Sequence, residues 1–583
     1  MNNQAIDPIT LEVMRNAFYS IADEMIVALI RASYSTNIKD RRDASCAIYT
    51  STGDVVVVAQ SEIGTPLHLG TMQSAVRSAM EAYPFDGLKP GDAVAMNMPY
   101  PAGPGHLNDL CLISPVFYKG EMIAITANQA HHVDMGGFAP GSMPFGVREI
   151  FQEGLQIPPI KLFRSGELEP ELWSLISQNV RPQVEVKGDL LAQYACNVTG
   201  SRRLSELMDR FGTTTVSTYL KEMISYSERR MRAALKKVPK GKYKYEDVIE
   251  GDGITDNPYM IRVEIESRGD SIKVDFSKSD DAALGPINCR WPSVAACVYY
   301  VFKAILDPEL PPNAGAYRPF EIIVRDGSVL SAIYPMSVCN ANIITTQRIT
   351  DVLLGALAEA IPEKIQAACS GTMNLLNIGG TNPRNGVLYN YIETYAGGQG
   401  AMHDLDGMHA IQSHMTNTRN APVEAIEAAY PLIVEKYALI PDSEGAGEYR
   451  GGVGLTRILR TLGDVQLTLS SDRASVPPWG LFGGEPAKPS KCEVIDSKGN
   501  KMGLPSKVTT SIPNDRVIVT ETPGGGGWGI PSMRDPQDVR LDVLDGLVSI
   551  ERARDVYKVQ IIPETLEIDE DTTLKLRDNC NRF

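Results

Sequence analysis

Apolar residues near the N-terminus recur at the spacing of a long helix. Between residues 8 and 33 they follow one another every three or four positions: Leu11, Met14, Phe18, Ile21, Met25 and Leu29. This interval places them on one side of a helix of about seven turns. Such a stripe predicts a helix that packs against a core.

Short β-rich runs follow this helix. The runs at 46–49 and 55–59 flank Ser51-Thr52-Gly53-Asp54, a sequence typical of a hairpin turn. Three further runs predict strands at 92–98, 110–117 and 122–127, and the last two would be joined by the turn Tyr118-Lys119-Gly120-Glu121. The N-terminal part therefore mixes helix and sheet.

The pattern changes along the rest of the chain. A second long helical region is predicted from about 202 to 237, strands at 261–265 and 272–276, and helices at 294–306 and 349–360. From about residue 386 glycine and proline become dense, and apolar runs shorten to strand length at 432–437, 465–469 and 517–520. We expect a mixed α+β fold with a helix-and-sheet N-terminal half and a more β-rich C-terminal part, divided into regions 1–238, 239–385 and 386–583.

Composition narrows the class of protein. The 71 acidic and 56 basic residues give a net charge of −15, without a basic run, so nucleic acid is not an expected partner. The longest apolar stretch, 294–306, is far too short to span a membrane, and the N-terminus lacks a signal-peptide pattern. The nine cysteines stand singly, which fits a reducing compartment. We expect a soluble cytoplasmic protein.

Phosphate-binding motifs are missing. The glycine-rich stretch 523–529 has no Gly-Lys-Ser/Thr ending, and no Gly-x-Gly-x-x-Gly unit follows a clear strand. The sequence therefore predicts that this chain has no nucleotide site of its own.

The histidines are few and unevenly spaced. Of the seven, three lie within 106–132 and three within 403–414, and none lies between 133 and 402. Histidines that served only as occasional core or surface residues would scatter along the chain. The clustering calls for a chemical explanation, since histidine is both an acid-base group near neutral pH and the commonest metal ligand.

The first histidine group lies at the ends of two predicted strands. If the strands at 110–117 and 122–127 pair through the turn between them, His131 falls within a residue of the position opposite Asp109, and facing side chains lie about 5 Å apart. His106 is on the loop that enters the first strand. Two imidazoles and a carboxylate leave a position open, the pattern of a catalytic divalent metal. A rim of hydrogen-bonded side chains is the alternative, and the clustering favours the metal.

Three other residues border this group. Asp134 and His132 are candidates for orienting the ligands. Asp43, in Arg41-Arg42-Asp43 at the start of the first hairpin, would serve as a fourth ligand or as the general base for a metal-bound water, unless the segment is only a charged turn. The residues alone do not choose between these roles.

The second histidine group lies in a glycine-rich polar segment. It comprises His403, His409 and His414. A second metal site is one interpretation, and a loop that serves the active-site wall or a subunit contact is the favoured one.

Longer motifs extend over nearly the whole chain and together are highly specific. They are NIKDRRD at 37–43, GHLND at 105–109, AHHVDMGG at 130–137, PGSMP at 140–144, HMTNTRN at 414–420, YRGGVG at 449–454, and the glycine-rich stretch that ends at Trp528-Gly529. By these motifs the chain resembles the hydantoinase B family, the subunit shared by N-methylhydantoinases, 5-oxoprolinases, caprolactamases and acetone or acetophenone carboxylases.

The resemblance implies a two-subunit enzyme. Family members work with a larger hydantoinase A-type partner, whose actin-like fold binds ATP with magnesium and phosphorylates the substrate, in agreement with the missing nucleotide motif. They hold zinc or manganese through His-x-x-Asp and a later His, which correspond to His106, Asp109 and His131. An Asp in the Arg-Arg-Asp segment, here Asp43, lies at the same centre as a ligand or a catalytic carboxylate.

These implications give a functional hypothesis. The chain would be a subunit of an ATP-dependent cyclic amide hydrolase that opens a hydantoin, 5-oxoproline or lactam ring after the partner phosphorylates the amide oxygen. A metal-activated water would attack, and Asp43 would accept its proton. The alternatives are a subunit of an ATP-dependent ketone carboxylase, which the length of 583 residues disfavours mildly, and a non-catalytic scaffold for the ATPase partner. The substrate, the metal and the stoichiometry of the expected hetero-oligomer stay open.

Overall fold

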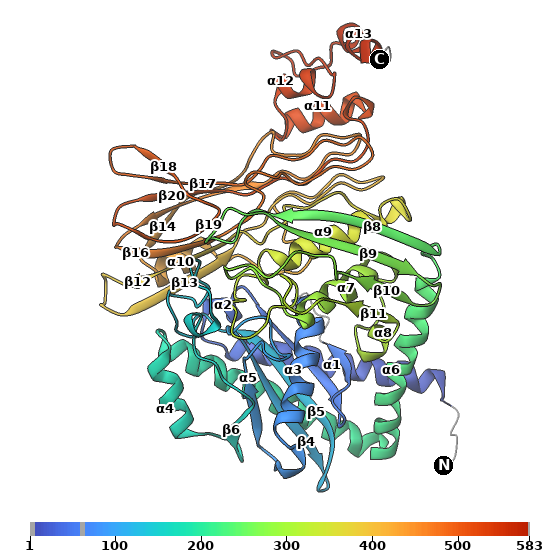
Figure 1. The fold of residues 1–583 in the computed structure, drawn as a ribbon, viewed down its shortest axis with the longest axis vertical. Coiled ribbons are helices and arrows are strands. Elements are labelled where there is room, and N and C mark those ends of the chain that lie inside the picture. Colours follow the sequence, from blue (N-terminus) through green and yellow to red (C-terminus); the bar gives the residue numbers. More distant parts are fainter. Residues whose placement is uncertain (1–5, 59–64, 581–583) are drawn as a thin grey trace.

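The computed structural model describes residues 6–58 and 65–580. The polar start of the chain, 1–5, and Ala59, the last residue of a predicted strand, lie outside the described residues. Helices and mostly antiparallel sheets alternate from one end to the other, which confirms the mixed α+β class (Figure 1). Within the described ranges, no helix has the length and apolar character needed to cross a membrane.

An antiparallel sheet forms the N-terminal layer. Its order is β2-β1-β5-β4-β3-β6-β7, and its strands are β1 (Ala44–Thr50), β2 (Val55–Val58), β3 (Ala93–Met96), β4 (Asp109–Tyr118), β5 (Glu121–His131), β6 (Ile160–Arg164) and β7 (Glu167–Leu168). Both predicted hairpins, β1–β2 and β4–β5, are confirmed. Because β5 lies between β1 and β4, the N-terminal end of β1 and the C-terminal end of β5 meet at one edge of the layer.

Helices cover this sheet. They are α1 (Pro8–Ala32), α2 (Thr36–Lys39), α3 (His68–Ala82), α4 (Pro170–Asn179), α5 (Gln183–Phe211) and α6 (Thr213–Leu235). The first predicted helix, 8–33, is confirmed as α1, which buries the predicted apolar positions from Met14 to Leu29.

The predicted helical region at 202–237 is helical in the structure, but it begins earlier than predicted and consists of two helices, α5 and α6. Two helices meet at Gly212, whose φ of +83° is a conformation that side-chain-bearing residues rarely adopt. The earlier start of α5 escaped detection because its buried face carries polar residues, among them Asp189, Gln193 and Asn197, which interrupt the apolar stripe. Gln193 and Asn197 donate instead to backbone oxygens of β4, Asn197 Nδ2 to Leu112 O at 3.0 Å, and Asp189 accepts from the backbone N–H groups of Tyr34 and Ser35.

The middle of the chain adds a second layer. Its sheet has the order β11-β10-β9-β8, with β8 (Gly241–Ile249), β9 (Tyr259–Ser267), β10 (Ile272–Asp275) and β11 (Phe320–Ile323), and its helices are α7 (Trp291–Leu306), α8 (Ala314–Tyr317) and α9 (Thr345–Leu357). The predicted strands at 261–265 and 272–276 and the helices at 294–306 and 349–360 are confirmed.

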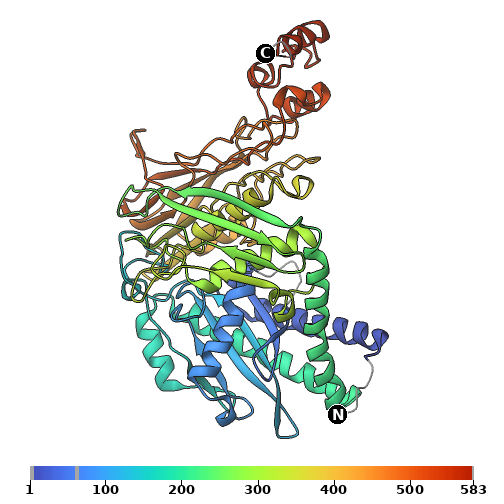
Figure 2. The same cartoon turned by 45° about the vertical axis from the view of Figure 1, so that its right-hand side comes forward.

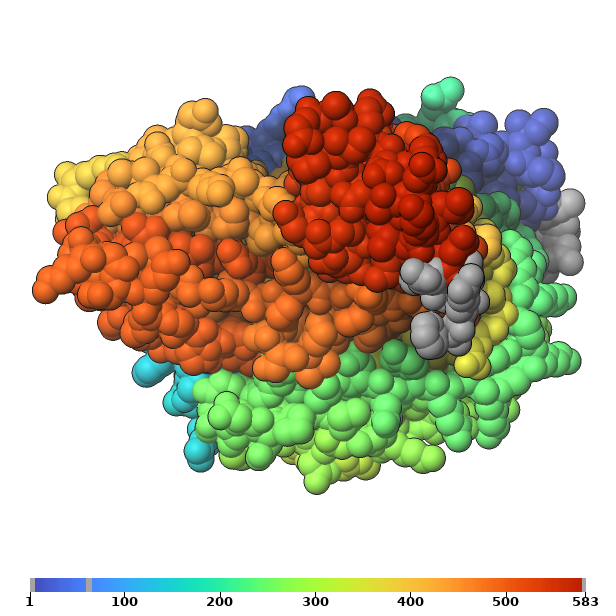
Figure 3. Space-filling model, turned by 90° about the horizontal axis from the view of Figure 1, so that it is seen from above, coloured from blue at the N-terminus to red at the C-terminus, as the bar shows by residue number. Residues whose placement is uncertain are grey.

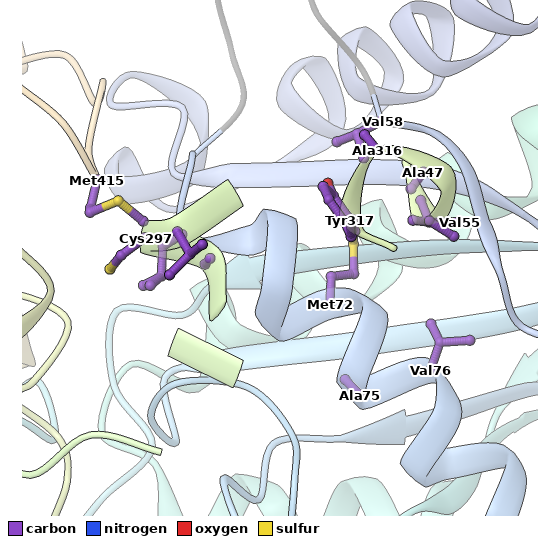
Figure 4. Packing of buried hydrophobic residues seen from close by; sticks show 14 of the residues in the cluster. Ala47, Val55, Val58, Met72, Ala75, Val76, Cys297, Ala316, Tyr317 and Met415 are labelled. Carbon is purple, nitrogen blue, oxygen red and sulfur yellow. The ribbon is translucent and has the colours of Figure 1, made fainter. Parts of the chain in front are cut away.

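The two layers share one hydrophobic core. Met72 and Val76 of α3, Val55 of β2 and Cys297 of α7 belong to the same buried cluster (Figure 4). Helix α3 approaches α7 so closely that a Cβ on Gly70 would stand 2.3 Å from the carbonyl oxygen of Pro292. The core continues to Met415, which belongs to a loop of the C-terminal part.

The C-terminal part is built from two further sheets, as the short strands predicted. One has the order β13-β12-β16-β19 and the other β14-β15-β20-β17-β18. Their strands are β12 (Leu375–Thr381), β13 (Leu388–Thr394), β14 (Leu432–Leu439), β15 (Leu455–Thr461), β16 (Val465–Ser470), β17 (Lys491–Ile495), β18 (Lys501–Gly503), β19 (Lys507–Ile512) and β20 (Val517–Glu521), accompanied by α10 (Val423–Ala429). A separate buried cluster fills the space between them.

The chain ends in helices that the sequence pattern did not predict. They are α11 (Pro536–Leu544), α12 (Ile550–Asp555) and α13 (Glu570–Cys580). They project from the C-terminal sheets as an arm (Figures 1 and 2), and seen from above they stand over those sheets (Figure 3). A small cluster around Val539 and Tyr557 forms the interior of the arm. The domain boundaries at 238 and 385 stay predictions.

Candidate metal and catalytic centre

Strand pairing places two aspartates and one histidine side by side at one edge of the N-terminal sheet. Asp109 of β4 is the register partner of His131 of β5, as the sequence predicted. On the other side of β5, Ala44 pairs with Ala130, and the His131 backbone N–H donates to the carbonyl oxygen of Asp43 at 3.1 Å. The edge of the sheet formed by the ends of β1, β5 and β4 therefore carries, side by side, Asp43, His131 and Asp109.

His106 completes this group from the loop before β4. Its Nε2 lies 3.3 Å from Asp109 Oδ2, and its ring meets that of His131 edge to face with 4.8 Å between centres. The opposite nitrogen, Nδ1, lies 3.0 Å from the carbonyl oxygen of Cys339. Because that oxygen only accepts, Nδ1 carries the proton and Nε2 faces Asp109.

His131 is held from behind by Asn37. The Asn37 amide Nδ2 lies 3.0 Å from His131 Nδ1 and donates to the His131 carbonyl oxygen at 2.6 Å. The Asn37 Oδ1 accepts from the buried guanidinium of Arg41, which also donates to Thr394 Oγ1 at 3.0 Å. Arg41, one of the basic neighbours of Asp43 in sequence, thus holds Asn37, which contacts His131, rather than Asp43 itself.

Asp43 lies at the mouth of the group. Its Oδ1 accepts a hydrogen bond from Thr65 Oγ1 at 3.1 Å, and the residue is only partly buried. Of Asp43, His131 and Asp109, it is the one with some solvent access. That position suits a group that exchanges protons with water.

The sequence reasoning missed His68. This buried histidine begins α3, and its Nε2 lies 3.8 Å from Asp109 Oδ1 while its Nδ1 lies 2.8 Å from Ser45 Oγ. It is isolated in the sequence, so histidine clustering gives no signal for it. Only the packing of α3 on the sheet brings it to Asp109.

A residue of the middle layer also reaches the group. Asn342 Nδ2 donates to Asp109 Oδ2 at 3.3 Å. This approach depends on Gly105, since a Cβ there would stand 2.4 Å from Asn342 Oδ1. The glycine of the GHLND motif therefore makes room for a side chain 237 residues further along the chain.

Burial and charge shift the protonation equilibria here. Burial raises the pKa of Asp109, but His106 and His68 outweigh it and leave that pKa well below its usual value. Burial lowers the pKa of His106, and the adjacent Asp109 reverses this and raises it. Burial dominates at His131, whose pKa falls to about 4. His131 is therefore neutral near pH 7, the form in which imidazole binds metals.

These residues line one pocket. Its cavity volume is about 30 Å³, space for a water molecule or an ion, and its other side is bordered by apolar residues of the middle layer and the C-terminal sheets, including Ile343, Met373 and Ile392. His132 and Asp134 do not line it. His132 Nε2 instead contacts Gln193 Oε1 of α5 at 2.9 Å, and Asp134 forms a 2.7 Å ion pair with Arg181.

The donor set suits a divalent ion. Imidazole nitrogens and carboxylate oxygens are the ligands of catalytic zinc, and ligand bonds of about 2.0–2.2 Å at tetrahedral angles set neighbouring donor atoms roughly 3.3–3.6 Å apart. The 3.3 Å between His106 Nε2 and Asp109 Oδ2 matches that spacing. Across residues 6–58 and 65–580, however, no three His, Cys, Asp or Glu side chains are already arranged to hold a metal ion.

The second histidine group does not converge. His403 stacks its ring edge-on to Trp528, with 5.1 Å between ring centres. His409 Nδ1 accepts from the backbone N–H of Val453 at 3.0 Å. His414 is buried elsewhere, beside Asp351.

Known proteins are similar to this chain in sequence and in fold. Residues 7–531 match the family model described as hydantoinase B/oxoprolinase. An uncharacterized protein of Methanocaldococcus jannaschii is 37% identical over 98% of this chain and 100% of its own length. A putative D-/L-hydantoinase subunit of a Pseudomonas species is 32% identical over 98% of both chains.

A solved structure extends the likeness to three dimensions. The ATP-dependent caprolactamase from Pseudomonas jessenii superimposes with a TM-score of 0.91 at 29% identity, over 99% of this chain and 100% of the other. Sequence motifs, fold and family model agree over almost the whole chain. The chain belongs to the hydantoinase B/oxoprolinase family.

Proposed function

We propose that this chain is the hydrolytic subunit of an ATP-dependent cyclic amide hydrolase. The observation that carries the proposal is the small pocket in which Asp43, His131 and Asp109 lie side by side, with His106 next to them. Relatives named as a hydantoinase subunit and an ATP-dependent caprolactamase support the substrate class. Hydantoin, 5-oxoproline and lactams are the candidate substrates.

We assign the metal to His106, Asp109 and His131, with zinc or manganese as the ion and Asp43 as a fourth ligand or a base. A divalent ion held by these residues would act as a Lewis acid and would lower the pKa of a bound water molecule from 15.7 to about 7. Asn37 and the Cys339 carbonyl group orient His131 and His106 from behind. Such supporting bonds keep ligand rings from rotating away.

The chain's own residues account for the remaining steps. Asp43, partly open to solvent and oriented by Thr65, accepts the proton of the attacking water. The pocket of about 30 Å³ has to open to admit a substrate ring, and Ile343, Met373 and Ile392 would then pack against that ring and exclude bulk water. Ring opening leaves a free carboxylate at one end of the product.

A second protein supplies the ATP chemistry in this proposal. The Pseudomonas relative is named as one subunit of its hydantoinase, and the sequence here carries no phosphate-binding loop. A hydantoinase A-type partner would bind ATP with magnesium, phosphorylate the amide and assemble with this chain in a hetero-oligomer. Phosphorylation of the amide oxygen makes the carbonyl carbon more electrophilic. After water adds there, the ring C–N bond breaks, the nitrogen leaves as an amine that takes up a proton, and a second water releases phosphate from the acyl phosphate to give the carboxylate.

Metal content and turnover test the proposal together. Elemental mass spectrometry of the chain, purified without chelators, should give about one zinc or manganese per wild-type chain, lost in His106→Ala and His131→Ala and kept in the control His409→Gln. With the A-type partner and ATP, Asp43→Asn and His131→Ala should abolish ring hydrolysis while size-exclusion chromatography still detects the complex.

Several outcomes would contradict it. Wild-type turnover in Asp43→Asn would remove Asp43 from the mechanism. A metal-free wild-type chain that still supports the partner would favour the scaffold function. ATP turnover that depends on bicarbonate and a ketone would assign the chain to the carboxylases.

A further inference from the structure

The helical arm formed by residues 531–580 is a rigid projection. Ion pairs fix it to the C-terminal part: the buried Arg534 lies 2.7 Å from Asp406, on a loop of that part, and Arg552 of α12 pairs with the buried Glu444. Separating such a pair would leave a charge without its partner. The arm therefore keeps one orientation as it stands out from the body (Figure 2).

Three segments meet where the arm leaves the C-terminal sheets, and each presents large apolar side chains to solvent. We call this surface the arm base; its side chains are 46–61% exposed, and they are Leu405, Met408, Phe482, Ile530 and Met533. Trp528 lies between the segments, since the rings of His403 and Phe482 each stand 5.1 Å from its ring. A Cβ on Gly483 would lie 3.0 Å from Ile530 Cγ1, so these two residues are neighbours. Single exposed apolar residues are common, whereas a contiguous group is typical of an interaction site.

Phe482 is held at this surface in a strained conformation. Its φ is +51°, a value that bulky residues rarely adopt. The flanking backbone fixes it, because the Leu481 N–H donates to the carbonyl oxygen of Gly527 at 2.9 Å and the Gly484 N–H donates to that of Leu481 at 2.8 Å. Strain of this kind persists where the surroundings determine the position of a residue, and it is frequent at sites that clamp a ligand.

The arm itself combines apolar and acidic residues. Leu541 and Leu544, three positions apart on one side of α11, are 52% and 45% exposed. Arg540 of the same helix is half-buried and pairs with Glu567 at 2.6 Å. Three acids of α11 and its caps are exposed, and they are Asp535, Asp538 and Asp545. A complementary partner surface is apolar with basic residues around it.

The relatives divide according to how much of the chain they match. The family match ends at residue 531, where the arm begins. The Methanocaldococcus jannaschii protein and the Pseudomonas hydantoinase subunit, matched over 98–100% of their own length, cover 98% of this chain. The 5-oxoprolinases of Dictyostelium discoideum and Arabidopsis thaliana are matched over only 40–42% of their length and cover 90% of this chain. The arm makes up about the share that these long chains leave unmatched.

This division distinguishes between two possible occupants of the surface. In a long chain the tether keeps neighbouring parts at a high effective concentration, so they need little surface to stay together. A separate subunit has to bind its partner through contacts alone. A second copy of the chain would be bound in the same way by both kinds of relative, so the division favours the ATP-binding partner.

We propose that the arm base and α11 form the surface on which this chain binds its A-type partner. The partner contributes an apolar face with basic residues around it, which the exposed aspartates of α11 attract. This inference rests on the proposed function, which supplies the ATP-binding partner. It places the contact far from α4, which lies at the opposite end of the molecule (Figure 1).

Calorimetric titration of the full chain with the purified A-type partner tests it. Met408→Glu combined with Met533→Glu puts two charges into the arm base and should weaken partner binding at least about tenfold. Leu541→Glu combined with Leu544→Glu changes α11 alone and should weaken it as much. This second variant covers the case in which the first does not fold, which thermal unfolding detects.

A matched control changes exposed apolar residues at the other end of the molecule. Leu175 of α4 and Val184 of α5 are 58% and 70% exposed. Leu175→Glu combined with Val184→Glu should bind the partner as tightly as the wild-type chain does. At saturating partner the arm variants should also reach the wild-type kcat, because only the affinity changes.

Salt tests the part assigned to charge. Raising the sodium chloride concentration from about 50 mM to about 500 mM should weaken wild-type binding by screening the aspartates of α11. Asp538→Asn combined with Asp545→Asn should respond less. An equal response would contradict the basic character assigned to the partner surface.

The outcomes separate this inference from the proposed function. Equal partner affinity of the wild-type chain and both folded arm variants would overturn the inference and leave the function standing. A wild-type chain that does not bind the partner would overturn both. Sedimentation that shows self-association of the wild-type chain, lost in the arm variants while partner affinity is unchanged, would assign the surface to a second copy.

Discussion

The two histidine-rich segments of this chain look alike in sequence and differ in structure. Around residues 106–131 the side chains of two neighbouring segments meet at Asp109 because β4 and β5 are hydrogen-bonded in register. Around 403–414 the three histidines occupy loops and point to three separate neighbours, Trp528, Val453 and Asp351.

This difference shows what a histidine cluster in sequence can predict. Strand pairing converts spacing along the chain into a known separation in space, because the register fixes which residues face one another. In loops, spacing along the chain does not predict which residues face one another. The first cluster therefore supports a shared chemical site, whereas each residue of the second needs its own explanation.

Removing the shared carboxylate should have the largest effect. Asp109→Asn keeps the size of the side chain and removes the charge that faces His106 and His68. We expect loss of the metal and a fall in kcat of about 1000-fold or more with the A-type partner, in line with the loss of a principal catalytic group. Steady-state kinetics and elemental analysis measure both. If this variant kept both its metal and its turnover, Asp109 would not be the centre of a shared chemical site, and the first segment would not differ from the second in this respect.

Glu153 gives a pH-dependent test of the loop behind His106. Its carboxylate accepts backbone N–H bonds from Val338 and Cys339, and burial raises its pKa to about 7. The unfolded chain ionises this group near pH 4.5, so the folded protein loses stability relative to Glu153→Gln as the pH rises from about 4.5 to 7. The change approaches roughly 3 kcal/mol.

Urea unfolding of both proteins at pH 5 and pH 8 measures this difference. Glu81→Gln, an exposed position of α3, is the control and should show no such change. A stability gap between wild type and Glu153→Gln that stays constant with pH would contradict the prediction.

Asn37 tests whether orientation of His131 matters. Its amide contacts both the ring nitrogen and the carbonyl group of His131. Removing such a supporting partner typically costs 10–100-fold in metal affinity or activity, and we expect Asn37→Ala to fall in that range for both. Competition with a metal-responsive dye gives the affinity. Asn514→Ala, on an exposed turn, should match wild type.

The smallest effect is expected in the second segment. His409→Gln removes one acceptor for the Val453 backbone N–H. Loss of a single hydrogen bond costs about 1 kcal/mol, with metal content and turnover unchanged. Thermal unfolding gives the stability. Loss of metal in this variant would mean that the two segments cooperate after all.

Local patterns predicted the parts of the fold and site that depend on neighbours in sequence. The α1 stripe, the β4–β5 hairpin and the register of Asp109 with His131 all follow from periodicity and turn residues. The break at Gly212 was missed because a glycine in a helical pattern does not reveal its φ.

Long-range packing accounts for what the sequence could not predict. His68 and Asn342 reach Asp109 from a helix and a loop whose placement depends on the whole core. Asp43 was a candidate from its place at the start of the first hairpin and from its family motif, and only the β1–β5 register explains its position beside His131. The helical arm was missed because its short helices follow a glycine-rich β region and bury few residues.

Ion pairs buried between the middle layer and the C-terminal sheets also determine how the protein unfolds. Asp247 belongs to β8, Arg348 to α9, and Arg473 follows β16, so these ion pairs join the middle layer to the C-terminal sheets. Separating these parts would leave several charges unpaired in an apolar interior, at several kcal/mol for each broken pair. The C-terminal sheets and the middle layer should therefore melt in one cooperative transition, and a chain cut at residue 385 should yield two fragments that fold only together.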